Sequence, residues 1–255
     1  GVKVGDYAFV GTSKLTFVFE EGLTEIGDYA FSGLTNLTEV TLPSTLTHIG
    51  AGAFMNTGIT SIAFPDALTY LGDYAFMGTG ITEVTLPKNL ETFGSQVFAN
   101  TGVTKITLPA KVTTLKASAF EGYTKLELLD LGSVKTLAAG VLGNAGSEIA
   151  EGKTFKVIIP ETVTTFPTKA FNNSFVTELV INTPNTASAT YLFSNGTSSS
   201  SIINTTLTKV TFGKDVETVA NYMFLNCTSL KTFESSTVKT IGQYAFSNTG
   251  LETYT

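Results

Sequence analysis

The feature that most constrains this chain is an aromatic anchor that recurs about every 22 residues along its whole length. The anchor is usually the Phe of an Ala-Phe pair and is once replaced by Leu. It occurs at Phe9, Phe31, Phe54, Phe76, Phe98, Phe120, Leu142, Phe171, Phe193, Phe224 and Phe246. A fixed period of this length is typical of a solenoid, in which each repeat stacks on its neighbours. We therefore expect one domain, residues 1–255, made of about eleven coils.

Each repeat contains three segments in a fixed order, as residues 37–58 show. Leu-Thr-Glu-Val-Thr-Leu-Pro comes first, then Leu-Thr-His-Ile-Gly, then Ala-Phe-Met-Asn-Thr-Gly. Alternation in the first segment predicts a short strand, with Val40 and Leu42 inward and Glu39 and Thr41 outward. The apolar residues of the second segment predict another inward-facing stretch. Strands of successive coils are expected to pair in parallel, because a single unit cannot bury its apolar side alone.

The third segment carries the anchor, and the sequence predicts one helical turn there. Gly-Asp pairs such as Gly27-Asp28 precede Tyr-Ala-Phe, and an Asp at this place is a good helix N-cap. Glycines such as Gly58 and Gly80 follow the anchor. We expect these glycines to adopt the left-handed conformation that returns the chain to the next strand.

These segments resemble the BspA-type leucine-rich repeats, which occur in surface proteins of gut and oral bacteria. The steps Leu-Thr-Glu-Val-Thr-Leu-Pro and Ile-Gly-x-x-Ala-Phe-x-Asn carry the resemblance, which covers essentially the whole chain. It implies an α/β solenoid, a leucine-rich-repeat horseshoe of about eleven 22-residue coils with a parallel β-sheet on its concave face. It also implies a cell-surface or secreted protein that adheres to host matrix or to other microbes, with any signal and anchor outside this sequence. Where the family often has Cys after Ala-Phe, this chain keeps only Cys227 and mostly has Thr, at Thr12, Thr57, Thr79, Thr101 and Thr249.

Two insertions lengthen the repeat at the same point, just after the anchor. They span residues 143–153 and 194–206, and they account for anchor intervals of 29 and 31 residues. Because both follow the anchor, we expect both to project as loops from one edge of the solenoid. Two interpretations stay open for them, a functional loop and a tolerated surface insertion.

Composition argues against several classes of function. The 15 basic residues are all lysine, against 21 acidic residues, so the net charge is −6. Without arginine the chain lacks bidentate contacts to phosphate or guanine, so nucleic acid is not an expected partner. His48 is the only histidine and Cys227 the only cysteine, and they lie about eight coils apart. We therefore expect no enzyme, no metal site and no cofactor, and the absence of an apolar run near 18 residues predicts no membrane insertion.

Outward strand positions in the middle of the chain predict where a protein partner binds. Most such positions are polar or small, but Leu128, Ile158 and Val180 are apolar and Asp130 accompanies them. An apolar patch on a polar face is a candidate contact surface, so these four residues are the predicted partner site of a monomer. The alternatives are that the insertions cover the patch, and that the chain is an inert spacer in a larger surface protein or enzyme. Phe17 and Phe19 are predicted as a second outward pair.

A tyrosine column two residues before the anchor allows two interpretations. It comprises Tyr7, Tyr29, Tyr74, Tyr222 and Tyr244. Its fixed place beside Ala-Phe favours a packing role over an aromatic platform for sugars.

Overall fold

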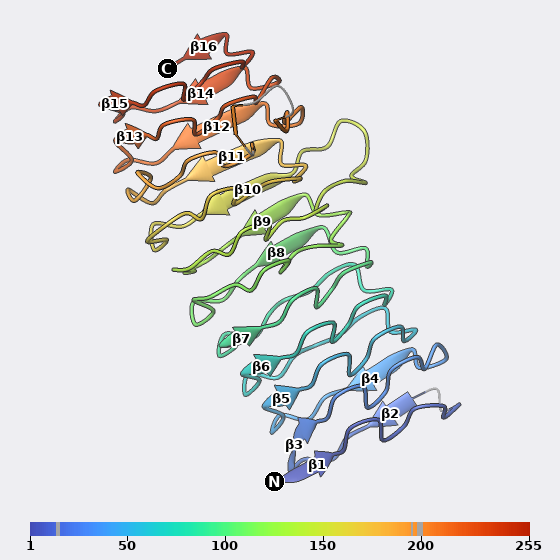
Figure 1. Cartoon of the computed structure of the whole chain (residues 1–255). Coiled ribbons are helices and arrows are strands. Elements are labelled where there is room, and N and C mark those ends of the chain that lie inside the picture. Colours follow the sequence, from blue (N-terminus) through green and yellow to red (C-terminus); the bar gives the residue numbers. More distant parts are fainter. Residues whose placement is uncertain (14–15, 195, 198–200) are drawn as a thin grey trace.

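The computed structural model is a parallel β-solenoid of about eleven turns, which Figure 1 shows as coils stacked from one terminus to the other. The structure describes residues 1–13, 16–194, 196, 197 and 201–255. We number the coils by their anchors, from Phe9 in the first coil through Leu142 in the seventh and Phe171 in the eighth to Phe246 in the eleventh. Part of the second predicted insertion, residues 195 and 198–200, lies outside the described residues.

The first segment of the repeat forms strands on one side of the solenoid, as the alternation predicts. They pair in parallel as a two-stranded sheet, β2-β4, and a seven-stranded sheet, β8-β9-β10-β11-β12-β14-β16. The strands are β2 (Thr16–Val18), β4 (Glu39–Thr41), β8 (Lys105–Thr107), β9 (Leu128–Asp130), β10 (Lys156–Ile159), β11 (Glu178–Ile181), β12 (Lys209–Phe212), β14 (Thr232–Glu234) and β16 (Thr253–Tyr254). We call the outward side of the seven-stranded sheet the long-sheet face.

The second segment forms a further set of parallel strands, which makes a second row along the solenoid. The order is β1-β3-β5-β6-β7 in one sheet and β13-β15 in another. These strands are β1 (Val2–Val4), β3 (Leu23–Ile26), β5 (His48–Ile49), β6 (Tyr70–Leu71), β7 (Thr92–Phe93), β13 (Thr218–Val219) and β15 (Thr240–Ile241). Isolated bridges from Thr114 to Thr136 and from Thr136 to Thr165 continue the row between them. The predicted inward-facing stretch is therefore itself β-structure.

The predicted helical turn at the anchor is wrong, since the described residues contain no helix. Each anchor lies in a series of tight turns that bond to the next coil. Tyr29 N–H donates to Ala51 C=O at 2.8 Å, and Phe31 N–H donates to Ala53 C=O at 2.8 Å. Tyr29, two residues before its anchor, has φ 54°, and a left-handed residue interrupts an α-helix. The α/β description is thus replaced by a β-solenoid, and the horseshoe curvature stays a prediction.

The aspartate that follows the Ile-Gly step bonds between coils and not within a helix cap. The Asp28 carboxylate accepts the N–H of Ala51 in the next coil at 2.7 Å. Asp6 accepts the N–H of Asp28 at 2.8 Å, and Asp73 accepts that of Ser95 at 2.8 Å. Each of these carboxylates therefore adds one side-chain hydrogen bond between adjacent coils.

The predicted role of the glycines after the anchor is also wrong. The left-handed residue lies two positions after the anchor, as at Asn56 with φ 56° and Asn100 with φ 54°. Gly58 is not left-handed, and a Cβ there would collide with the carbonyl oxygen of Thr35 in the preceding coil. Glycine is required at this position because two coils touch.

The core is a stack of anchor rings along the solenoid axis, as the period predicts. Phe31 and Phe54 have ring centroids 5.1 Å apart, Phe54 and Phe76 are 5.2 Å apart, and all three side chains are fully buried. Leu142 fills the same place in the seventh coil and is also buried. Phe17 and Phe19 were predicted to point outward, but Phe17 is only 8 % exposed and both rings pack edge-on against Phe31. The strand register sets the direction of Phe17, because Phe17 pairs with Val40, an inward residue.

Candidate binding site

The predicted partner residues lie together on three adjacent strands of the long-sheet face. Leu128 and Asp130 come from β9, Ile158 from β10 and Val180 from β11, and all four are half-buried. Ile158 lies opposite Asp130 on one side and Val180 on the other, while Leu128 lies opposite Lys156. Strand alternation thus places the three apolar side chains outward and partly exposed, with Ile158 and Val180 side by side and Leu128 diagonal to Ile158.

Polar groups frame this patch. Lys156 and Glu178 form an ion pair at 3.4 Å beside Ile158 and Val180. The Asp130 carboxylate accepts the N–H of Gly132 at 2.9 Å, which fixes its direction. A hollow of about 320 Å³ begins beside Asp130 and Ile158, and no residue of either insertion lines it.

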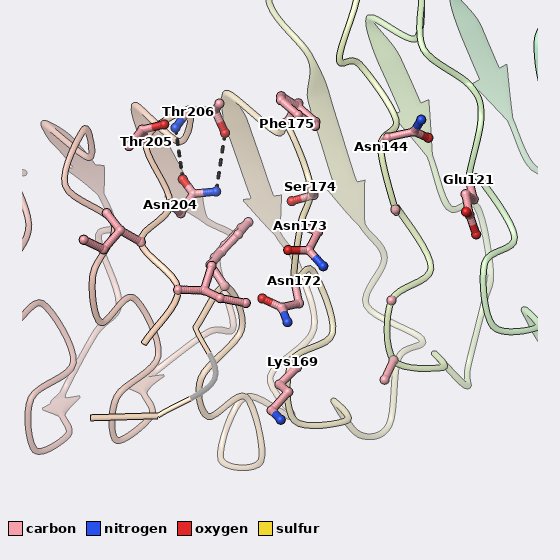
Figure 2. Close-up of a pocket in the computed structure, with 16 residues that line it drawn as sticks. Glu121, Asn144, Lys169, Asn172, Asn173, Ser174, Phe175, Asn204, Thr205 and Thr206 are labelled. Carbon is pink, nitrogen blue, oxygen red and sulfur yellow. Dashed lines mark hydrogen bonds between the residues drawn. The ribbon is translucent and has the colours of Figure 1, made fainter. Parts of the chain in front are cut away.

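A larger groove, which sequence reasoning missed, lies between the two insertions. Its volume is about 780 Å³. Figure 2 shows residues 172–175 running between Asn144 and Glu121 on one side and residues 204–206 on the other. We call 172–175 the floor, 139–144 the first wall and 202–206 the second wall. The groove shares no residue with the Leu128 patch.

The second wall is held by its own hydrogen bonds and offers apolar groups. The Asn204 carboxamide oxygen accepts the N–H of Thr206 at 3.2 Å, and the Thr206 hydroxyl donates to Val176 C=O at 3.0 Å. Ile203 is 54 % exposed, and Phe175 of the floor is 39 % exposed. The sequence located both insertions but carried no sign that their residues meet.

The remaining candidate residues serve packing. His48 stacks on Tyr70 with ring centroids 4.1 Å apart, and Cys227 is buried, which raises the pKa of its thiol. In the tyrosine column, Tyr7 and Tyr29 stack at 5.4 Å, as do Tyr222 and Tyr244. Stacked rings cover each other's faces, which are the surfaces that a sugar would use.

The described residues contain neither a metal-binding cluster nor a membrane-spanning helix. Within residues 1–13, 16–194, 196, 197 and 201–255, no group of three or more His, Cys, Asp or Glu side chains is placed to hold a metal ion. The same part of the chain has no helix that is long and apolar enough to span a membrane.

The model of one protein family matches most of the chain. It is the BspA type leucine rich repeat region, with six copies over residues 2–127 and 156–255. The chain belongs to the BspA-type leucine-rich-repeat family. The gap between the matched ranges contains the first insertion, so the BspA-type pattern weakens where one wall of the groove is built.

Solved structures of other bacterial leucine-rich-repeat proteins are similar to this BspA-type chain. A protein from Bacteroides ovatus is 20% identical with a TM-score of 0.53, over 97% of this chain and 68% of that one. A protein from Eubacterium ventriosum is 22% identical with a TM-score of 0.45, over 99% and 84%. A leucine rich cell surface protein from Faecalibacterium prausnitzii is 16% identical with a TM-score of 0.35, over 99% and 82%. The first similarity supports the fold alone, and no curated protein matches the chain.

Proposed function

We propose that this chain is a non-catalytic protein-binding module that acts in adhesion, to host matrix or to other microbes, at a cell surface or in secreted form. The observation that carries the proposal is the cluster of Leu128, Ile158 and Val180 on the long-sheet face. Outward positions on neighbouring strands carry polar residues such as Thr107 and Thr211. Apolar groups that gather on an otherwise polar face are typical of a contact surface.

The patch is suited to a partner of modest affinity. Each of the three apolar side chains contributes about 1.5–3 kcal/mol when it passes from full exposure to full burial, and these half-buried groups contribute less. The chain has no tryptophan or arginine, the residues that most often anchor tight interfaces. Strong attachment therefore requires many copies acting together on one surface.

The test is a triple variant with Leu128, Ile158 and Val180 each changed to Thr. Binding to an immobilised host extracellular-matrix extract is measured by surface plasmon resonance, and circular dichroism verifies the fold. A matched control changes Thr16, Thr41 and Thr85 to Ser, which alters three exposed outward positions away from the patch. We expect the triple variant to lose the signal and the control to keep it. Equal signals exclude this patch, and no signal from the unaltered chain favours an inert spacer.

A further inference from the structure

The groove between the insertions lies where the solenoid loses one set of coil-to-coil bonds. At other junctions the anchor turns are linked by backbone bonds, as where Asn56 N–H donates to Met77 C=O at 2.8 Å. Between the seventh and eighth coils, no hydrogen bond in the described part of the chain joins residues 139–144 to residues 168–173. The two rows of strands continue across this junction, through β9-β10 and through Thr136 and Thr165. Only the anchor turns separate.

The first insertion explains the separation, because it bonds backward to the sixth coil. Gly146 N–H donates to Tyr123 C=O at 3.0 Å, and Glu148 N–H donates to Thr124 C=O at 2.8 Å. Lys125 pairs with the Glu148 carboxylate at 3.2 Å. On the other side, Phe171 N–H donates to Leu192 C=O at 2.9 Å, in the ninth coil. Each side of the junction is thus held by the coil beyond it.

The separation leaves backbone groups without partners along the groove. Gly140 and Asn144 of the first wall have N–H groups that, in the described structure, donate to no protein group. By the pattern of the other coils, the N–H of Asn144 would donate to the C=O of Asn172, which also lines the groove and accepts no bond there. An extended polypeptide carries C=O and N–H groups along both edges. It can therefore accept hydrogen bonds from the N–H groups of the first wall and donate one to the C=O of Asn172.

A side chain of the floor is unpartnered in the same place. Ser174 stands in the column where other coils have Thr, whose hydroxyl donates to the anchor C=O three residues before. Thr79 does so to Phe76 at 2.8 Å and Thr101 to Phe98 at 2.6 Å. Ser174 is only 6 % exposed, yet its Oγ has no partner, and neither has the buried Oδ1 of Asn172. Serine lacks the methyl group that restricts χ1 in threonine, so this hydroxyl is free to turn to a ligand.

We propose that this groove binds a short extended peptide segment, held by backbone hydrogen bonds to Gly140, Asn144, Asn172 and Ser174. An apolar side chain of the peptide packs on Phe175 and Ile203, the exposed apolar residues beside the floor. The floor is four residues long, so at about 3.3 Å per residue it accommodates about four residues of peptide. This site is separate from the Leu128 patch, and neither proposal depends on the other.

The peptide class follows from the spacing of the unpartnered groups. The free N–H groups of Gly140 and Asn144 lie four residues apart on one wall, which is twice the two-residue period at which an extended backbone presents groups to one side. At other junctions the backbone of the next coil accepts from this row, as where Phe54 N–H donates to Ala75 C=O at 2.8 Å. A glycan carries hydroxyl groups but no repeating pattern of carbonyl and amide groups.

The test begins with phage-displayed random hexapeptides selected on the immobilised full chain. The most enriched peptide is synthesised with a fluorescent label, and its Kd is measured by anisotropy. We expect Ser174→Ala to weaken binding by about fivefold or more, through loss of one hydrogen bond. Ile203→Asp changes an exposed side chain and should weaken binding at least as much. Methylating alternate backbone nitrogens of the peptide should weaken binding about tenfold or more.

Thr79→Ala is the matched control, because it removes a buried hydroxyl of the same column outside the groove. It should lower the Tm yet keep the Kd within about twofold, whereas Ser174→Ala should keep or raise the Tm. The proposal is overturned if no peptide is enriched, or if the methylated peptide binds equally well. It is also overturned if the groove variants bind the peptide normally, or if a glycan panel binds in its place and loses binding in those variants.

Discussion

Replacing Gly50 by Ala tests whether contact between coils fixes glycine at the Ile-Gly step. Gly50 does not have the left-handed φ that would itself require glycine. A Cβ on Gly50 would lie 2.7 Å from the backbone nitrogen of Asp28 and 2.7 Å from the carbonyl carbon of Gly27. Ordinary contact begins at 3.4 Å, so the preceding coil has to move away by about 0.7 Å.

The displacement strains bonds that join these two coils. Gly50 N–H donates to Ile26 C=O at 2.8 Å, and Ala51 N–H donates to the Asp28 carboxylate at 2.7 Å. Overpacking costs about 1–3 kcal/mol, and each weakened hydrogen bond adds up to about 1 kcal/mol. We expect a loss of about 2–4 kcal/mol, which lowers the Tm by roughly 5–15 °C for a chain of this size.

Gly5→Ala is the matched control, because Gly5 holds the same position in the first coil and a Cβ there meets nothing within 4 Å. It should leave stability unchanged or raise it by about 0.4–1 kcal/mol, through the unfolded chain. Thermal unfolding followed by circular dichroism measures both variants. If Gly50→Ala melts within a degree or two of Gly5→Ala, close packing of coils is not the reason for this glycine.

Four further expectations concern the core and the titrating groups. Phe76→Ala should cost about 3–5 kcal/mol and Thr85→Ala less than about 0.5 kcal/mol in chemical denaturation; equal losses would contradict the inward and outward assignment. Tyr123→Phe should cost about 1–3 kcal/mol, because the Tyr123 hydroxyl accepts the N–H of Phe98 at 3.0 Å. Burial raises the pKa of the Cys227 thiol, so stability is complete below the ordinary thiol pKa of about 8.5 and falls as pH rises above it. Cys227→Ala should flatten that slope between about pH 8 and 10 in urea midpoints, and an unchanged slope would refute the assignment. A chelator should leave the Tm unchanged, and a shift of several degrees would reveal a metal site.

The groove could not be predicted from the sequence. Both insertions were visible as longer intervals between anchors, and Ser174 was visible as a serine in a threonine column. Neither sign predicts a cavity, because the groove depends on which neighbouring coil each insertion bonds. That choice is made by contacts such as Gly146 with Tyr123, which have no pattern in the sequence.

The prediction of a helical turn at the anchor was wrong for a related reason. Asp before Tyr-Ala-Phe is compatible with a helix cap and equally with a carboxylate that accepts a bond from the next coil. The capping preference of Asp cannot distinguish these two roles, because the competing partner, the N–H of Ala51, belongs to another repeat. The left-handed conformation at Tyr29 is stabilised by that neighbouring coil through the bond from Tyr29 to Ala51.

The sequence by itself determined the stacking period, the inward column of anchors and the outward positions of Leu128, Ile158 and Val180. Periodic burial requires periodic apolar residues, so these features are written directly into the chain. Phe17 and Phe19 are exceptions among the strand assignments, because Phe17 pairs with the inward Val40 and both rings pack on Phe31. Only the tertiary structure decided that the anchor segments form tight turns bonded to the next coil, that glycine marks contact between coils, and that one junction opens into a groove. Each of these depends on the distance between adjacent coils, which no single repeat contains.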